Sequence, residues 1–240
     1  MRGYDFDWSV LWREPYGRWM LQAIFTTVHL SLIAWCIACI LGLIVGTMRI
    51  LPSRIARAIG TAYVEVIRNI PYLVQLFMWY FMIPLLLPKT TQMWLIDNVP
   101  NMPYWTGVIC LGVYTASRVA EHLRAGMHSI PDEQYRAAYS TGLSTFQTYR
   151  YVIIPYGVRI VIPPLTTEFL TCFKNSALTM TIGVLETTGM AYLIDSYTWH
   201  GLETISGAMM VYIITSMSIV AFMGWVESRT RIPGMLGRGR

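Results

Sequence analysis

The chain has 240 residues, of which 13% are charged and 55% are hydrophobic. Because an average soluble domain carries roughly 25% charged residues, this composition argues against an intrinsically disordered chain, a collagen-like repeat and a nucleic-acid-binding domain. The formal net charge is +5, and its meaning depends on where the charged residues lie.

Four long stretches contain no Asp, Glu, Lys or Arg. They cover residues 19–48, 69–88, 98–117 and 204–226. A helix needs roughly 20 mostly apolar residues to cross a bilayer, so each stretch is predicted to hold one membrane span. The first ten residues carry Asp5 and Asp7 and lack the basic start of a signal peptide. The first span is therefore predicted to remain in the membrane.

A fifth span is predicted within residues 156–183. Arg159, Glu168, Lys174 and two consecutive prolines interrupt this stretch, and a surface helix between spans is the alternative. Strongly apolar segments flank these residues on both sides and favour a span. The predicted fold is an all-α integral membrane protein with one domain over residues 1–240. Its five transmembrane helices are predicted near residues 19–48, 69–88, 104–124, 157–183 and 204–226, with a cytoplasmic two-helix loop at 129–155.

The basic residues predict how the chain is oriented. With five spans, 11 Lys and Arg residues lie on the side of the C-terminus and 4 on the side of the N-terminus. Basic residues favour the cytoplasmic side, so the N-terminus is predicted outside and the C-terminus inside. A four-span chain would weaken this bias. The net charge is thus interpreted as an orientation signal within membrane lipid, and no nucleic-acid partner is expected.

The cysteines do not predict a reactive site. Cys36 and Cys39 have the spacing of a redox pair, but all four cysteines lie in predicted spans, so packing is the favoured interpretation. No cluster of His, Cys, Asp and Glu has metal-site spacing, so no metal site is predicted.

The inward loop at 129–155 carries signals for two short helices. Pro131 suits a first helical turn, and Gly142 is a natural helix stop. Ser144 or Thr145 can cap a second helix, predicted over residues 146–153 and ending before Pro155. A plain surface loop with helical turns is the alternative interpretation.

This loop resembles the EAA loop of ABC-importer permeases, which reads Glu-Ala-Ala, three residues, Gly, nine residues, then aliphatic, any residue, aliphatic and Pro. Ala137, Ala138, Gly142 and Pro155 match that spacing, whereas Arg136 stands where the family has glutamate. The resemblance implies that these five residues couple the chain to an ATPase subunit.

Two further segments are similar to those of polar-amino-acid permeases. Residues 68–77 resemble their Arg-Gly-Thr-Pro-x-x-Val-Gln segment, and residues 174–184 resemble their Lys-Asn/Asp-Ser-Ser-Leu…Ile-Gly-Val segment. The resemblance covers residues 20–230. It implies a type I ABC-importer permease core in a bacterial inner membrane, with a second permease chain, ATPase subunits and an extracytoplasmic amino-acid-binding protein as partners.

The chain itself is not expected to be an enzyme. Neither Lys89 nor Lys174 follows a glycine, so no Gly-x-x-x-x-Gly-Lys phosphate loop is present. ATP and Mg would be bound by the partner ATPase, and no cofactor is expected in this chain.

Charged residues inside spans are candidate substrate contacts, because a charge at mid-bilayer costs ~2.5–3.5 kcal/mol on insertion scales. At the position of Arg118 the family usually has Tyr, while Glu121 matches a family acid. Permeases assigned to glutamate and aspartate resemble this chain in having Arg there. Arg118 is therefore predicted to bind a substrate carboxylate, and a self-compensating pair with Glu121 is the alternative.

Glu168 is the second candidate, since by resemblance it falls where family members line the central substrate site. An acid there could hold the α-ammonium of an amino acid, with helix–helix bonding as the alternative. Lys174 lies six residues on, about 240° around the helix, so it cannot share the face of Glu168 without a break. Lys174 and Asn175 rank below Glu168, because they could equally fix the backbone.

Together these observations predict the membrane permease of an ATP-driven importer of polar amino acids, with glutamate and aspartate favoured. Glutamine or another polar amino acid is the main alternative substrate. A self-sufficient secondary transporter and a non-transporting membrane scaffold are the alternative classes.

Overall fold

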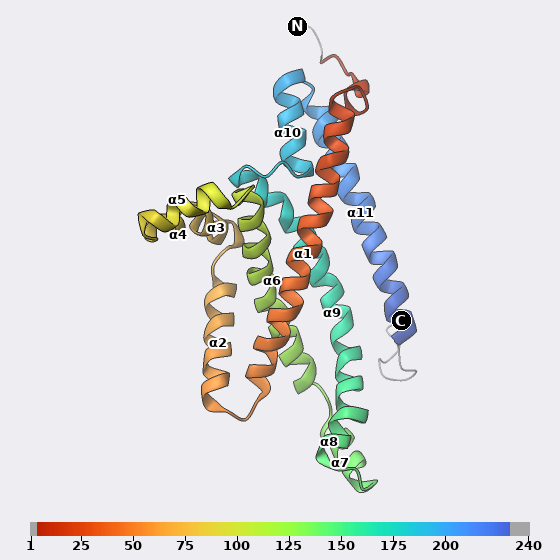
Figure 1. Cartoon of the computed structure of the whole chain (residues 1–240). Helices are drawn as coiled ribbons and strands as arrows, with labels where there is room; N and C mark the ends of the chain where they lie inside the picture. The colour runs from red at the N-terminus through yellow and green to blue at the C-terminus, as the bar shows by residue number, and fades with distance from the viewer. Residues whose placement is uncertain (1–3, 231–240) are drawn as a thin grey trace.

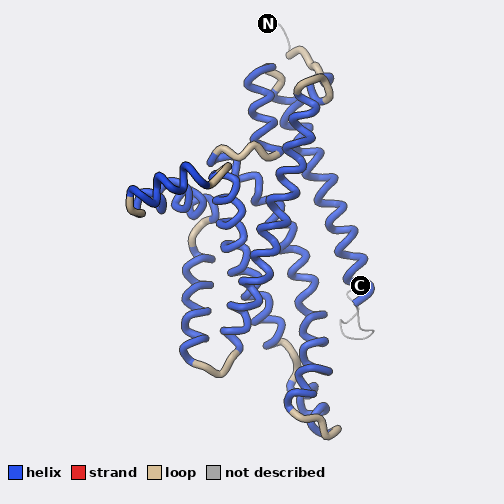
Figure 2. The backbone as a smooth tube through the Cα atoms, viewed as in Figure 1, coloured by secondary structure: helices blue, strands red, loops and turns tan. Residues whose placement is uncertain are grey.

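The computed structural model describes residues 4–230, and these form helices joined by short connections, with no strand among them (Figure 2). Four basic residues that enter the orientation argument, Arg2, Arg231, Arg238 and Arg240, lie outside the described residues.

The longest helix, α1 (Tyr16–Ile50), has 35 residues and packs along α6 (Met102–His128) through small residues. A Cβ at Gly42 would lie 2.5 Å from the Val119 side chain, and one at Gly112 would lie 2.8 Å from Ile37. These glycines let the two backbones approach closely, as is common where membrane helices meet. A short 3-10 helix, η1 (Trp8–Leu11), precedes α1 and is capped by the Asp7 side chain.

The structure differs from the predicted helix at residues 69–88. Instead, α2 (Arg54–Asn69) is followed by α3 (Tyr72–Phe77), the π-helix η2 (Met78–Met82) and α4 (Ile83–Leu86), with a bend of 100° between α2 and the rest. Pro71 causes the bend, because the residue before a proline disfavours helical backbone, and Ile70 is extended. The Gln75 amide donates to the carbonyls of Ile67 and Ile70 and stabilises the turn.

The following helix, α5 (Lys89–Asn98), extends sideways from the body of the molecule together with α4 (Figure 1). The chain then returns into α6. Tyr72 and Leu76 of α3 are buried in the main apolar core with Tyr104, Val108 and Leu111 of α6.

The predicted inward loop contains α7 (Asp132–Ser140) and α8 (Thr145–Thr148), which lie at one end of the molecule (Figure 1). Ser144 caps α8, and the Gln147 side chain accepts from the Ser144 backbone N–H, so this is a capping box. The predicted stop before Pro155 does not occur. The π-helix η3 (Tyr149–Ile153) instead continues into α9 (Ile154–Asn175), and Pro155 is tolerated in the first turn of α9.

Helix α9 ends in the 3-10 helix η4 (Ser176–Ile182), and α10 (Thr187–Thr198) and α11 (Gly201–Thr230) complete the described chain. Pro163 and Pro164 lie inside α9 without breaking it. By length and composition α1 and α11 can cross a membrane, and up to four spans result if the bent pairs at 54–86 and 145–198 each count as one.

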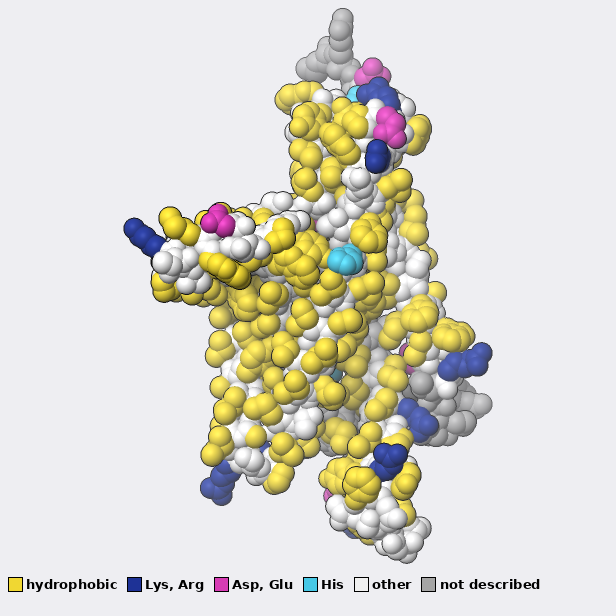
Figure 3. All heavy atoms as spheres, viewed as in Figure 1, with side chains coloured by type: hydrophobic (Ala, Val, Ile, Leu, Met, Phe, Trp, Pro, Cys, Tyr) yellow, Lys and Arg dark blue, Asp and Glu magenta, His cyan; other side chains and the backbone are white. Residues whose placement is uncertain are grey.

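Hydrophobic side chains cover the middle of the face seen in Figure 3, while Lys and Arg lie at its margins, near the two ends, on the right edge and at the tip of the segment that extends to the left. This distribution fits a helical body in lipid with polar ends in water.

Candidate functional site

Three titratable side chains from α6 and α9 meet inside the helical body and form the open cluster. Arg118 and His122 are one turn apart on α6, and Glu168 faces them from α9. The Arg118 Nη1 and His122 Nε2 atoms lie 3.6 and 3.5 Å from Glu168 Oε2. Two of the predicted residues, Arg118 and Glu168, are therefore brought together.

Close packing of α9 on α6 places Glu168 there. A Cβ at Gly126 of α6 would lie 2.4 Å from the Val161 side chain. The absence of a side chain at Gly126 therefore allows α9 to pack this closely on α6. Val161, Glu168 and Cys172 are all buried on one face of α9. Since the helices are antiparallel (Figure 1), Glu168 then falls beside Arg118, about two turns from Gly126.

The members of the open cluster differ in exposure. The Glu168 side chain is 5% exposed, and the Arg118 side chain is 40% exposed. The guanidinium lies 5.7 Å from the centroid of the Tyr114 ring, and its Nε atom is buried without a hydrogen-bond partner. At 3.6 Å the ion pair is looser than a bidentate contact. Arg118 therefore keeps donors available for another anion.

Glu121 belongs to a different group, the closed cluster of Arg49, Glu121 and Arg124. Arg49 at the end of α1 and Arg124 of α6 each donate to Glu121, the latter at 2.6 Å. Arg49 is buried, and Gly60 of α2 lies against its side chain. Arg118 and Glu121 therefore do not pair with each other, as the alternative interpretation expected. Arg118 pairs with Glu168 of α9 and Glu121 with Arg49 of α1, because α1 and α9 contact different sides of α6.

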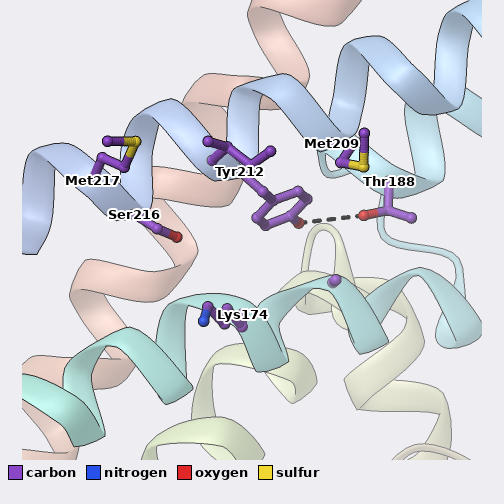
Figure 4. A pocket seen from close by; sticks show the side chains of 8 residues that line it. Lys174, Thr188, Met209, Tyr212, Ser216 and Met217 are labelled. Atoms are coloured by element: carbon purple, nitrogen blue, oxygen red, sulfur yellow. Dashed lines mark hydrogen bonds between the residues drawn. The ribbon is translucent and has the colours of Figure 1, made fainter.

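Lys174 and Asn175, at the end of α9, lie away from both clusters. As the helical spacing predicted, Lys174 is exposed on a different face from Glu168. It lines a groove of about 540 Å³ between α9 and α11 with Thr188, Tyr212 and Ser216 (Figure 4). No acid pairs with Lys174 within residues 4–230, so this groove offers one further cation beside α11.

Two further titratable residues, His122 and the buried Glu186, were not predicted from the sequence. His122 could have been found from its spacing of four residues from Arg118. Glu186 is fully buried at the start of α10, where it accepts hydrogen bonds from the Gly189 N–H and the Tyr212 hydroxyl. It is the one charged residue between Lys174 and Asp195, and this isolation was an available signal.

The predicted coupling residues lie at the end of the molecule formed by α7 and α8 (Figure 1). Arg136 and Ala137 are exposed, whereas Ala138 is buried. Gly142 has a φ of 79°, a left-handed conformation that favours glycine, and Pro155 begins α9. The loop thus presents one face of α7 to solvent.

No metal-binding group of three His, Cys, Asp or Glu residues occurs in the described part of the chain. Cys36, Cys39, Cys110 and Cys172 are free.

The helical fold, its long apolar helices and its end-on helical loop define an all-helical membrane permease. The family model described as "Binding-protein-dependent transport system inner membrane component" matches residues 38–232. The chain belongs to this family, and is a multi-pass inner-membrane permease rather than an enzyme or an ATPase. This confirms the predicted class over the secondary-transporter and scaffold alternatives.

Several known proteins are similar over nearly the whole chain. The glutamate/aspartate import permease protein GltJ of Escherichia coli strain K12 is 36% identical over 97% of this chain and 98% of its own. The glutamine transport system permease protein GlnP of the same strain is 27% identical over 95% of this chain and 99% of its own.

Solved structures of ABC transporters share the fold. A crystal structure of an amino acid ABC transporter with histidines has a TM-score of 0.80 at 27% identity, covering 94% of this chain and all of the other. The MetNI methionine ABC transporter matches with a TM-score of 0.74 at 16% identity, over 92% of this chain and all of the other. The latter supports the fold alone.

Proposed function

We propose that this chain is the permease subunit of an ATP-driven importer of glutamate and aspartate. The observation that carries the proposal is the half-exposed Arg118 beside the buried Glu168. The 36% identity to a glutamate/aspartate import permease supports the same substrate. The proposed arrangement has five spans, an outward N-terminus, a cytoplasmic C-terminus, a second permease chain, ATPase subunits and an extracytoplasmic binding protein.

The open cluster suits an acidic amino acid. The Arg118 guanidinium can bind the side-chain carboxylate through two parallel N–H donors, a geometry that lysine lacks. Glu168 can accept from the α-ammonium that every free amino acid carries. His122, one turn further along α6, lies against the same oxygen of the Glu168 carboxylate as Arg118. In this scheme Glu168 serves all amino acids, and Arg118 selects the acidic ones.

The remaining predicted residues are given other roles. Glu121 already receives two arginines and ties α1 to α6. Lys174 lines the groove beside α11, where it can attract anions toward the path, and Asn175 is the last residue of α9. Neither arrangement requires direct contact with the bound amino acid.

We further propose that α7 and α8 dock on the ATPase through Arg136, Ala137, Ala138, Gly142 and Pro155. The helical path from Thr145 to Asn175 runs through η3 without a break. A displacement of α8 by the ATPase is therefore passed along α9 to Glu168. ATP and Mg would be held by that partner, and this chain would convert its closure into opening of the path.

Glutamine is the second candidate substrate, favoured by the similarity to a glutamine permease. The two candidates differ in the need for a cation at position 118. A carboxamide substrate gains little from a guanidinium, whereas a carboxylate gains a charge-assisted hydrogen bond of about 1.5–3 kcal/mol.

The test is stimulation of ATPase activity in the reconstituted complex with its binding protein, screened over the amino acids. We expect glutamate and aspartate to stimulate most, and Arg118→Tyr to reduce their stimulation about 10- to 100-fold. Strongest stimulation by glutamine, or an unchanged profile in Arg118→Tyr, would contradict the acidic substrate.

A further inference from the structure

A lateral arm, residues 78–98, extends from the body of the molecule (Figure 1). It consists of η2, α4 and α5, and none of its 21 residues is buried. The arm is fixed at its base, because Tyr72 and Leu76 just before it lie in the main core. The 100° bend after α2 then directs it away from the other helices of this chain. Trp79 and Tyr80 at the base of the arm pack on that core, whereas the exposed apolar side chains further along the arm remain for another surface to cover.

The arm exposes enough apolar surface for a stable interface. Eight of its large apolar side chains are at least 40% exposed, from 40% for Ile83 to 82% for Leu86. At about 200 Å² for each large side chain, they expose roughly 1,000 Å² together, compared with about 800 Å² per partner in a standard protein interface. The members are Phe81, Met82, Ile83, Leu85, Leu86, Met93, Trp94 and Ile96.

Lipid alone does not suit this surface. Met93, Trp94, Leu95 and Ile96 are consecutive, so their side chains leave α5 in four directions about 100° apart. A helix that lies on a membrane has one apolar face in lipid and one polar face in water. Because α5 lacks such a division, a protein that reaches around it covers it better.

The depth of the arm in the membrane indicates which partner protein can cover it. Tyr104, just after the arm, bonds to His29 of α1. Arg49, which directly follows the predicted first span and marks its inner end, lies 20 residues further along α1. Twenty helical residues rise about 30 Å, which is the thickness of a bilayer core. The arm therefore lies near the outer edge of that core. The start of α1 and the end of α10 extend beyond it, and α7 and α8 lie at the opposite end (Figure 1).

We propose that the lateral arm packs on the second permease chain near the outer face of the membrane. A soluble binding protein would first meet the far ends of α1 and α10, and an ATPase would meet α7 and α8. A neighbouring permease chain is the component at the depth of the arm. This inference rests on the proposed function, which supplies that second chain.

Photo-crosslinking in the intact complex in native membranes tests this contact. Benzoyl-phenylalanine is placed at Leu86 or Trp94 of the arm, and at Phe146 of α8, which is 74% exposed. We expect Leu86 and Trp94 to cross-link to the second permease chain, and Phe146 to the ATPase. Arm probes that reach only lipid or the binding protein would overturn the inference, whereas loss of the Phe146 cross-link would count against the proposed function.

A variant pair tests the energetic role of the arm. In the double variant Leu86→Ser/Trp94→Ser both changed residues are exposed, by 82% and 58%, so we expect a nearly unchanged unfolding temperature for the isolated subunit. We expect at least a tenfold loss of the second permease chain in co-purification. The matched control Val66→Ser changes a 58% exposed residue of α2 and should co-purify normally. Equal recovery in both variants would overturn the inference.

Discussion

The open cluster and the closed cluster both depend on α6, where Arg118 and Glu121 are three residues apart. In the closed cluster one acid receives two arginines at short distance, and the Arg49 side chain is 7% exposed. In the open cluster one buried acid faces a cation that is 40% exposed at 3.6 Å. The same residue types therefore differ in their capacity to bind a ligand, because the helices that pack around them differ.

The difference concerns what remains available to a ligand. Glu121 has both carboxylate oxygens occupied and joins α1 to α6 beside α2. Arg118 retains donors and an accessible side. Since a buried ion pair stabilises mainly by avoiding an uncompensated charge, the closed cluster is expected to maintain the fold. The open cluster is expected to decide which amino acid binds.

The largest effect is expected for Glu121→Ala. This change leaves buried Arg49 without its acid, and breaking a buried pair costs about 3–5 kcal/mol. We expect loss of most folded protein, measured as a lower unfolding temperature and poor recovery in detergent. Arg124→Ala is the matched control, because its 35% exposed side chain should contribute only about 1 kcal/mol. Equal losses in the two variants would remove the distinction between the clusters.

A smaller effect, on transport, is expected for Glu168→Gln. The amide keeps the size of the carboxylate but loses its charge, so the α-ammonium of every substrate loses its counter-ion. We expect uptake of acidic and neutral amino acids to fall alike, by about 10-fold for a loss of 1.4 kcal/mol. Uptake by the complex in proteoliposomes measures this. A fall confined to the acidic amino acids would show that Glu168 acts through Arg118.

The smallest effect is expected outside both clusters, for Ser144→Ala. It removes the capping box of α8 and costs about 1 kcal/mol of local helix stability. We expect substrate preference to be unchanged and substrate-stimulated ATPase activity to fall a few-fold. Thr145→Ala is the control, since Thr145 follows the cap and its side chain is exposed. A changed substrate preference in Ser144→Ala would contradict the separation of coupling from selection.

Much of the fold followed from local chemistry. Apolar runs located α1 and α11, and Ser144 and Gly142 marked helix ends that the structure confirms. The bend at Pro71 was not predicted, because a run without charged residues does not show whether the chain forms one straight helix there. The segment between the first two predicted spans, residues 49–68, was not predicted to be helical, yet most of it forms α2.

The candidate site was less predictable, because it depends on contacts between distant helices. Arg118 and Glu168 were singled out as charges within spans, but their pairing depends on the approach of α9 at Gly126. Glu121 resembled a partner of Arg118 by spacing alone. Arg49, 72 residues away, competes for it, and no local pattern in the sequence predicts that contact.

The most direct test is the ratio of glutamate to glutamine uptake in Arg118→Gln and Glu121→Gln, each assembled with its partners. We expect Arg118→Gln to lower this ratio at least tenfold, and Glu121→Gln to lower total uptake while leaving the ratio within about twofold of the parent. A ratio that moves equally in both variants, or only in Glu121→Gln, would contradict the assignment of substrate selection to the open cluster.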